Sequence, residues 1–186
     1  MALESAESVV VSSEGALAVV MMSRDDAPRA EVGPQDSSVT TVIRHRGGSR
    51  QVRLENGQRW HLPRGKSSQD IPETDSLGDE LQAAANRLVR KWGPDKLSRE
   101  EKRAIDEAFD QGEFFQAARL EGQARGRWVE KELRKQFSHL EWNSKGVDIT
   151  GPKGQGFHYE VLAGTDDNFG RHGRRMFDIF FRMIFF

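Results

Sequence analysis

The chain of 186 residues contains no cysteine, no long apolar run and no large excess of charge of either sign. The lack of cysteine excludes disulfide bonds, thiolate metal sites and a cysteine nucleophile. The longest apolar stretch, 9–22, is interrupted by Ser12, Ser13 and Glu14 and follows no basic residue, so we expect neither membrane insertion nor an ordinary signal peptide. With 28 Lys and Arg against 29 Asp and Glu, the net charge of -1 excludes a globally basic nucleic-acid-binding protein.

The residues that are present suffice for one folded domain with a tail or a small second unit. Apolar residues make up 36% and the mean hydropathy is -0.70, which describes a polar chain able to bury one core. The charge is uneven, with a small excess of Lys and Arg in 121–186 and of acids elsewhere. Two interpretations of this pattern have about equal support: a C-terminal half that binds a polyanion, and ordinary surface charge.

The chain divides by composition into three segments. Residues 1–36 are rich in Ser, Glu, Asp, Gly and Pro, and we interpret them as a flexible or docking tail. Residues 37–75 are a β-hairpin region and linker, because 38–44 alternates like a strand and Asn56-Gly57 predicts a hairpin over 51–62. Residues 76–186 then comprise a helical segment and a compact C-terminal domain.

Three helices begin the last segment. Apolar residues recur at helical spacing in 76–92, and Gly93-Pro94 ends that helix. Ser98, with Glu101 three residues later, predicts a capping box at the start of a helix over 98–110. A third helix is expected over 113–137, where Val129 and Leu133 mark its buried side.

After residue 137 the apolar period changes from that of a helix to that of strands. We expect short strands at 139–143, 146–150 and 157–163, a helix at 166–176 and a buried final strand in 177–186. The predicted fold class is α+β, with a C-terminal core in the order helix, strand, strand, strand, helix, strand.

Asp148 and Glu160 lie in the middle of two consecutive predicted strands and are flanked by Val and Ile. A carboxylate inside a strand opposes β-propensity and risks burial, so two of them suggest acids that converge on a cation. Glu130, on the preceding helix, could join them. Hard cations such as Mg²⁺ or Mn²⁺ prefer oxygen ligands, lower the pKa of bound water and neutralise the charge of a phosphodiester.

This order of elements, with these acids, resembles the restriction-endonuclease-like PD-(D/E)xK nuclease fold over residues 113–186. The resemblance implies a metal-dependent endonuclease in which Asp148 and Glu160 bind Mg²⁺ or Mn²⁺ and Glu130 completes the catalytic site. The chain departs from the family at Leu162, where the family has a catalytic lysine. Lys145, or His158 on the same strand face as Glu160, could take the role of that lysine.

A second resemblance rests on 156–165 with Asn168, His172, Arg175 and 181–184, and also on 125–130 and 145–148. These stretches are similar to the C-terminal toxin domains of bacterial polymorphic toxins. The resemblance implies an antibacterial effector that is secreted or delivered and acts in the target-cell cytoplasm. A cognate immunity protein would hold it inactive in the producer cytoplasm, and DNA is the favoured nucleic-acid substrate for this fold.

The predicted helix 166–176 contains four basic or imidazole side chains: Arg171, His172, Arg174 and Arg175. Arg171 and Arg175 are four residues apart and share a face with His172. We therefore predict a nucleic-acid-binding surface that contacts phosphates beside the metal site. A solvated charged face is the alternative interpretation.

Two further functions stay open. In a metal-independent ribonuclease toxin, His158 and His172 would be the acid/base pair, and Asp148 and Glu160 would be structural. In a non-catalytic protein-interaction module, the hairpin, the three helices and the Phe-rich end would bind a partner, and Asp148 would be dispensable.

Overall fold

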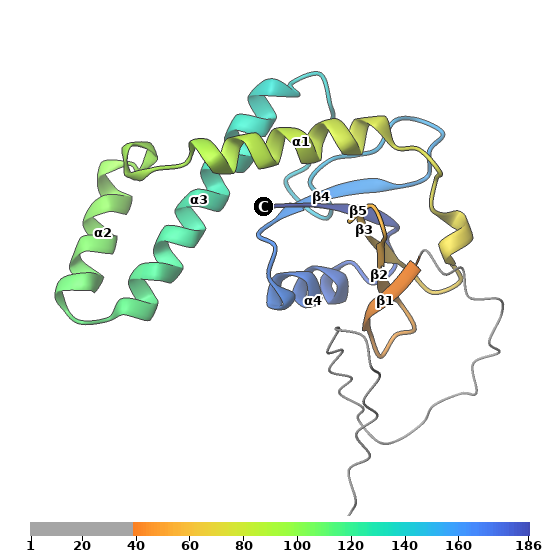
Figure 1. Ribbon diagram of the computed structural model, residues 1–186, viewed down its shortest axis with the longest axis horizontal. Coiled ribbons are helices and arrows are strands. Elements are labelled where there is room, and N and C mark those ends of the chain that lie inside the picture. Colours follow the sequence, from red (N-terminus) through yellow and green to blue (C-terminus); the bar gives the residue numbers. More distant parts are fainter. Residues whose placement is uncertain (1–38) are drawn as a thin grey trace, which may run out of the picture. The chain divides into compact units, whose positions relative to one another are not determined.

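The structure, a computed structural model, describes residues 39–186, which belong to one compact unit (Figure 1). The tail predicted at 1–36 lies outside the described residues. The strands are β1 (Val39–Arg44), β2 (Arg50–Leu54), β3 (Arg59–Leu62), β4 (His158–Leu162) and β5 (Phe181–Phe185). The α-helices are α1 (Ser76–Lys91), α2 (Arg99–Asp110), α3 (Phe114–Gln136) and α4 (Asp166–Arg175).

The five strands form one mixed sheet in the order β1-β2-β3-β5-β4. β1, β2 and β3 form an antiparallel meander, and β3 pairs antiparallel with β5, where Trp60 lies opposite Arg182. β4 and β5 are parallel, with α4 as the connection between them. The α+β class is confirmed, and the predicted hairpin region forms part of the same sheet as the C-terminal strands.

Helices cover both faces of this sheet (Figure 1). On the face of α1 and α3, Leu81, Leu133 and Trp60 pack with the alternate side chains Tyr159 and Ile184 of β4 and β5. On the face of α4, a smaller cluster contains Val147, Leu162, Phe169, Phe181 and Met183. Because side chains alternate along a strand, neighbouring residues of β4 and β5 belong to different layers.

The two strands predicted at 139–143 and 146–150 are wrong as regular strands. This segment makes only single bridges, in which Ile149 lies antiparallel to both Trp142 and Tyr159. Side chains take the places of ladder bonds, because the Asn143 Nδ2 amide donates to the Val147 carbonyl. The Val161 amide likewise donates to the carboxylate of Asp148 instead of to a backbone carbonyl.

The predicted final strand begins later than expected. β5 starts at Phe181, and the preceding residues form a turn in which the Ile179 amide donates to the Met176 carbonyl. Phe177 consequently lies outside the core and is 55% exposed.

Helices α2 and α3 form an antiparallel hairpin that extends away from the sheet (Figure 1). The capping box predicted at Ser98 is confirmed, since the Glu101 amide donates to Ser98 Oγ and the Ser98 amide donates to the Glu101 carboxylate. The same carboxylate accepts two hydrogen bonds from Arg127 of α3, at 3.1 and 2.8 Å, which fastens the base of the hairpin. Within residues 39–186, no helix combines the length and the apolar character that a membrane crossing needs.

Candidate active site

Asp148 and Glu160 lie on neighbouring segments, and the carboxylate of each accepts a backbone amide from the segment of the other. The Asp148 amide donates to Glu160 Oε2 at 3.0 Å. In return, the Val161 amide donates to Asp148 Oδ2 at 2.8 Å. Glu160 is only 1% exposed, in the middle of β4, while Asp148 is partly buried on the bridged segment beside that strand. The two carboxylates thus take part in a reciprocal contact across adjacent extended segments.

The electrostatics of this pair favour protonation of one acid. Burial, together with the negative charge of Glu160, raises the pKa of Asp148 to about 7. The hydrogen bond from the Val161 amide opposes the shift, as does the nearby Arg134, whereas Glu130 adds to it. An acid whose pKa lies near neutrality responds to small changes in its surroundings, which is typical of functional sites.

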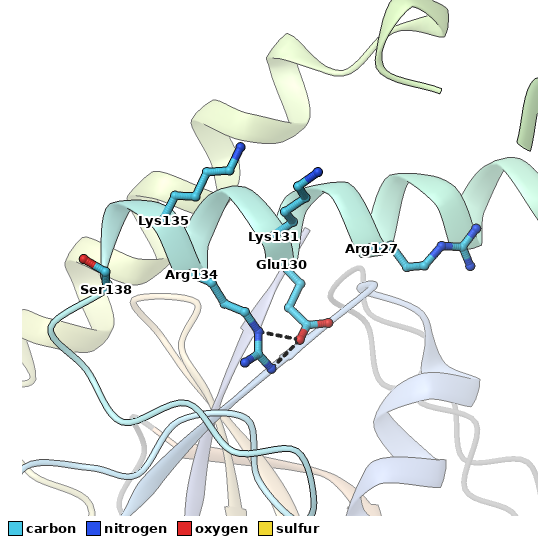
Figure 2. Close-up of a pocket in the computed structure, with 6 residues that line it drawn as sticks. All are labelled: Arg127, Glu130, Lys131, Arg134, Lys135 and Ser138. Carbon is cyan, nitrogen blue, oxygen red and sulfur yellow. Dashed lines mark hydrogen bonds and ion pairs between the residues drawn. The ribbon is translucent and has the colours of Figure 1, made fainter. Parts of the chain in front are cut away.

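Glu130 approaches the pair from α3. Its Oε1 accepts two hydrogen bonds from Arg134, one turn further on, at 3.0 and 2.7 Å. The guanidinium of Arg134 also donates to the Asn143 carbonyl at 3.2 Å and lies over the Trp142 ring. Figure 2 shows that Glu130 and Arg134 point from α3 toward the strands, while Lys131 and Lys135 point the other way. Arg134 therefore connects the helix acid to the segment that contains Asp148.

A surface pocket of about 530 Å³ lies along this part of α3 (Figure 2). Four cationic side chains and one acid line it, together with one serine: Arg127, Glu130, Lys131, Arg134, Lys135 and Ser138. Arg127, Arg134 and Lys135 are each paired with a glutamate. The pocket is accordingly a basic surface with its charge partly compensated.

Helix α4 presents two nitrogen groups to Glu160. His172 Nδ1 lies 2.5 Å from Glu160 Oε1, and Arg175 Nη2 donates to the same oxygen at 3.0 Å. His172 is largely buried, whereas the side chain of Arg175 is 58% exposed. This contact leaves the second ring nitrogen of His172, Nε2, without a partner in the described part of the chain.

The sequence of α4 explains why these groups reach Glu160. The Thr165 side chain caps the helix by accepting from the Asn168 amide, and acids in the first turn with arginines in the last complement the helix dipole. Gly173 packs closely against the side chains of Gln51, in β2, and His45, in the turn after β1. A Cβ at this position would come within 2.4 Å of Gln51 Nε2 and 2.5 Å of His45 Nε2. Gln51 also donates to the Phe169 carbonyl at 2.6 Å. The N-terminal hairpin therefore supports the helix that completes the site.

The other predicted site residues lie apart from the acid pair. His158 accepts a hydrogen bond from the Gly151 amide through Nδ1, which stabilises the turn before β4. Lys145 is exposed in a loop, and the described residues include no hydrogen bond or ion pair to it. Arg171 donates to Asn168, and Arg174 is exposed on α4. Burial, with the charge of Arg174 as a smaller cause, lowers the pKa of His45. Of the predicted phosphate-binding residues, only His172 and Arg175 contact an acid of the pair.

No group of three or more His, Asp or Glu side chains in residues 39–186 forms a ready metal-binding set. The structure brings Glu130, Asp148 and Glu160 into one electrostatic neighbourhood, but hydrogen bonds from α4 and Arg134 occupy the carboxylates of Glu160 and Glu130.

Two charged residues were not identified from the sequence: one lies beside the acid pair and the other lies in β5. Arg134 lies four residues after Glu130, a spacing that favours an ion pair on a helix and could have pointed to it. The second is Arg182, a charged residue inside the apolar strand β5. The same pattern, a charge within an apolar strand, had indicated Glu160.

Arg182 is 2% exposed on the opposite face of the sheet from Glu160. Its guanidinium donates to Asp75 Oδ2 at 2.8 Å and to Asp79 Oδ1 at 2.6 Å. Asp75 also accepts from the Tyr159 hydroxyl at 2.8 Å and caps α1 by accepting from the Gly78 amide at 3.0 Å. This cluster fastens the start of α1 to β4 and β5.

Comparisons of the chain with family models, with curated proteins and with solved structures found no match.

Proposed function

We propose that the chain is a metal-dependent endonuclease that hydrolyses phosphodiester bonds, with DNA as the favoured substrate. The observation that supports this proposal most is the reciprocal contact of Asp148 and Glu160 on neighbouring extended segments. Burial and the negative charge of Glu160 raise the pKa of Asp148, so the environment disfavours the ionised pair, and a bound cation would remove that penalty.

The order of elements around the pair supports the same proposal. Helix α3 precedes the two bridged segments and β4, and α4 then leads to β5, which is parallel to β4. This is the order of the nuclease core that the chain resembles, with Asp148 on the second segment and Glu160 on the third. Leu162, at the place of the family lysine, is buried in the apolar cluster under α4.

The donor set fits a hard divalent cation, since Asp148, Glu160 and Glu130 all offer carboxylate oxygens. A cation would also favour the ionised form of Asp148, whose pKa is raised by burial and by the charge of Glu160. Asp148 and Glu160 would hold Mg²⁺ or Mn²⁺, with Glu130 as the third acid. The ion supplies Lewis-acid activation of water and neutralises charge on the phosphodiester.

The chain's own residues would orient the substrate and stabilise charge. Arg175 places positive charge, and His172 a ring nitrogen, beside Glu160, where the family uses the lysine that Leu162 replaces. Arg171 and Arg174, exposed on the same helix, would contact flanking phosphates. We therefore assign the role of the missing lysine to α4. Among the described residues, Lys145 and His158 make no hydrogen bond to Asp148 or Glu160.

A second candidate, a metal-independent ribonuclease, is favoured by one contact. A carboxylate that binds Nδ1 of a histidine fixes the tautomer of the ring and leaves Nε2 to exchange protons with substrate. Glu160 and His172 form such a pair. In this mechanism, Arg175 would stabilise charge on the phosphate, and His158 would be the second acid/base group.

Cleavage of plasmid DNA and of total RNA by the purified full chain distinguishes the two mechanisms. The reactions contain Mg²⁺, Mn²⁺ or EDTA and compare the wild type with Glu160→Gln and Asp148→Asn. We expect cation-dependent DNA nicking that either substitution lowers by roughly 10²-fold or more. Glu132→Gln, on α3 but paired with Lys135, is the matched control and should leave nicking unchanged.

Other outcomes identify the alternatives. RNA cleavage that survives EDTA and is lost in His172→Ala would favour the ribonuclease. The absence of cleavage under all conditions, with variants that unfold like the wild type, would contradict both nuclease mechanisms and favour a non-catalytic interaction module.

We also propose that the nuclease is a toxin delivered into target-cell cytoplasm and neutralised by a cognate immunity protein. The similarity of 156–165 and 181–184 to polymorphic-toxin domains supports this role. Expression of the chain in a bacterial host should arrest growth, and Asp148→Asn should restore it. Normal growth with soluble wild-type protein would contradict the toxin role without bearing on cleavage in vitro.

A further inference from the structure

The tip of the α2–α3 hairpin displays three aromatic side chains on the protein surface. Phe109, at the end of α2, is 60% exposed, while Phe114 and Phe115, at the start of α3, are 59% and 96% exposed. Phe109 and Phe114 pack edge to face with ring centroids 5.1 Å apart. Together the three rings expose roughly 400 Å² of aromatic surface. Patches of this size on a single chain often mark binding sites.

The tip is held in one conformation. Gly112, with φ of 74°, adopts the left-handed conformation that ends α2, and its amide donates to the Phe109 carbonyl. The Glu113 amide donates to the Ala108 carbonyl and completes the cap. Small side chains, Ala108 and Ala117, pack between the two helices. A rigid aromatic surface loses little conformational entropy on binding, so it suits recognition.

The rim around these rings is acidic. Four exposed acids lie in the last two turns of α2 and in the loop: Asp106, Glu107, Asp110 and Glu113. Arg103 compensates Glu107 in part, at 3.6 Å. Arg119, one turn after Phe115, is also exposed and bonds to the neutral Gln116, so the surface has an apolar centre and a border with a net negative charge.

This border argues against two occupants. A second copy of the chain would bring acids against acids, and the aromatic area of two tips is about half of a standard interface. The first 38 residues contain seven acids, at positions 4, 7, 14, 25, 26, 31 and 36, and only two basic residues, Arg24 and Arg29. The charge of that segment is thus not complementary to the tip.

We propose that the hairpin tip docks a different protein, whose apolar pocket takes Phe115 and has a border of Lys and Arg. Phe115 is the central anchor, Phe109 and Phe114 cover its flank, and the acids set orientation and association rate. The tip lies at the far end of the hairpin from the sheet that contains Glu160 (Figure 1). This surface is independent of the proposed cleavage reaction, and an inactive chain should bind equally well.

Photo-crosslinking in cells that naturally make the protein tests the proposal. The photoreactive residue p-benzoylphenylalanine replaces Phe115 in the full chain, and mass spectrometry maps the crosslinked peptide. We expect one discrete protein with Lys or Arg beside the crosslinked position. Adducts within the chain, to a second copy or to lipid, or no adduct, would overturn the proposal.

Variants of the full chain then measure the interaction with the purified partner. Phe115→Ser should weaken binding by roughly 10-fold or more, as for a central anchor. Asp106→Asn with Asp110→Asn should slow association several-fold and reduce its salt dependence. Phe177→Ser, an equally large exposed aromatic outside the tip, is the control and should bind like the wild type. Binding that is indifferent to Phe115→Ser, or stronger in high salt, would contradict the assignment.

Discussion

Strands β4 and β5 have a buried charged cluster on each face, and the two clusters differ in balance. On the face of α1, Arg182 lies between Asp75 and Asp79, and the Tyr159 hydroxyl completes the set. On the face of α4, the carboxylates of Glu160 and Asp148 each accept a backbone amide from the other's segment, and the nitrogen groups near them belong to His172, Arg134 and the exposed Arg175.

This difference separates a structural role from a functional one. Opposite charges that satisfy each other in a closed environment stabilise one arrangement, provided that both partners are present. Like charges held together raise a pKa and reduce stability, as burial and Glu160 do for Asp148. The acid-rich cluster also lies beside a helix with exposed basic side chains, among them Arg175. We therefore assign a functional role to the acid-rich cluster beside α4 and a stabilising role to the Arg182 cluster beside α1.

The largest expected effect is on the balanced cluster. Arg182→Met leaves Asp75 as an uncompensated buried charge and should lower the free energy of unfolding by about 3–5 kcal/mol. Urea unfolding measures this change. Arg175→Met, at the half-exposed arginine of the other cluster, should cost less than about 1 kcal/mol. Equal losses for the two variants would remove the distinction between the clusters.

The second effect is a pH dependence of the free energy of unfolding that originates at Asp148, in the acid-rich cluster. The pKa of Asp148 is about 7 in the folded chain and about 3.8 when unfolded, so the folded state binds this proton more tightly. The resulting stability is complete below pH 3.8 and is lost as the pH rises through 7. Asp148→Asn should therefore become more stable relative to the wild type by about 2–3 kcal/mol between pH 5 and 8.

Urea unfolding of both proteins at several pH values provides the test. Burial lowers the pKa of His61 to about 4, which makes the whole fold gain stability as the pH rises. That contribution is common to both proteins and cancels in their difference. A difference that is constant from pH 5 to 8 would show that the pKa of Asp148 is not raised in the folded chain.

A third change tests whether the hairpin strands position α4. Gly173→Ala places a methyl group against Gln51 and His45 and should cost about 1–3 kcal/mol of stability. It should also lower cleavage, because His172 and Arg175 move with the helix. Gly170→Ala is the matched control, since its methyl group meets only the flexible end of Arg174 at 3.2 Å. If both variants behave alike, the hairpin does not position the site.

The smallest effect is stabilisation by the cation. A millimolar affinity for Mg²⁺ would raise the free energy of unfolding at pH 7.5 by about 1 kcal/mol in 10 mM Mg²⁺. Thermal unfolding against NaCl of equal ionic strength measures this binding without any substrate. The gain should disappear in Asp148→Asn and persist in Arg171→Gln, whose side chain contacts only Asn168. Equal stabilisation of all three proteins would contradict a site at the acid pair.

Much of the fold could be predicted because its signals are local. Helical spacing located α1 and α3, Ser98 with Glu101 located the start of α2, and Asn56-Gly57 located the β2–β3 hairpin. The bridged segments could not be predicted as such. Some of their bonds use side chains, since the Val147 carbonyl accepts from Asn143 and Asp148 accepts from the Val161 amide, and the second bond requires β4 to lie alongside.

The candidate site divides in the same way. Charges within apolar strands directed attention to Asp148 and Glu160, because burial of a carboxylate needs a reason that is visible in the sequence. The partners of Glu160 on α4 were predicted for phosphate binding, and their contact with the acid was not foreseen. Lys145 was proposed because it precedes the segment of Asp148, and His158 because it shares a strand face with Glu160; neither pattern reports which atoms come into contact.

By itself, the sequence determined the α+β class, the helices with their caps and the acids that merit attention, since these follow from residue spacing and burial cost. Only the tertiary structure decided that the hairpin joins β5, that α4 lies on Gln51 and His45, and that Arg182 balances Asp75 on the opposite face. These pairings join residues more than a hundred positions apart. Long-range pairings arise from the simultaneous packing of all the layers, for which no local pattern exists.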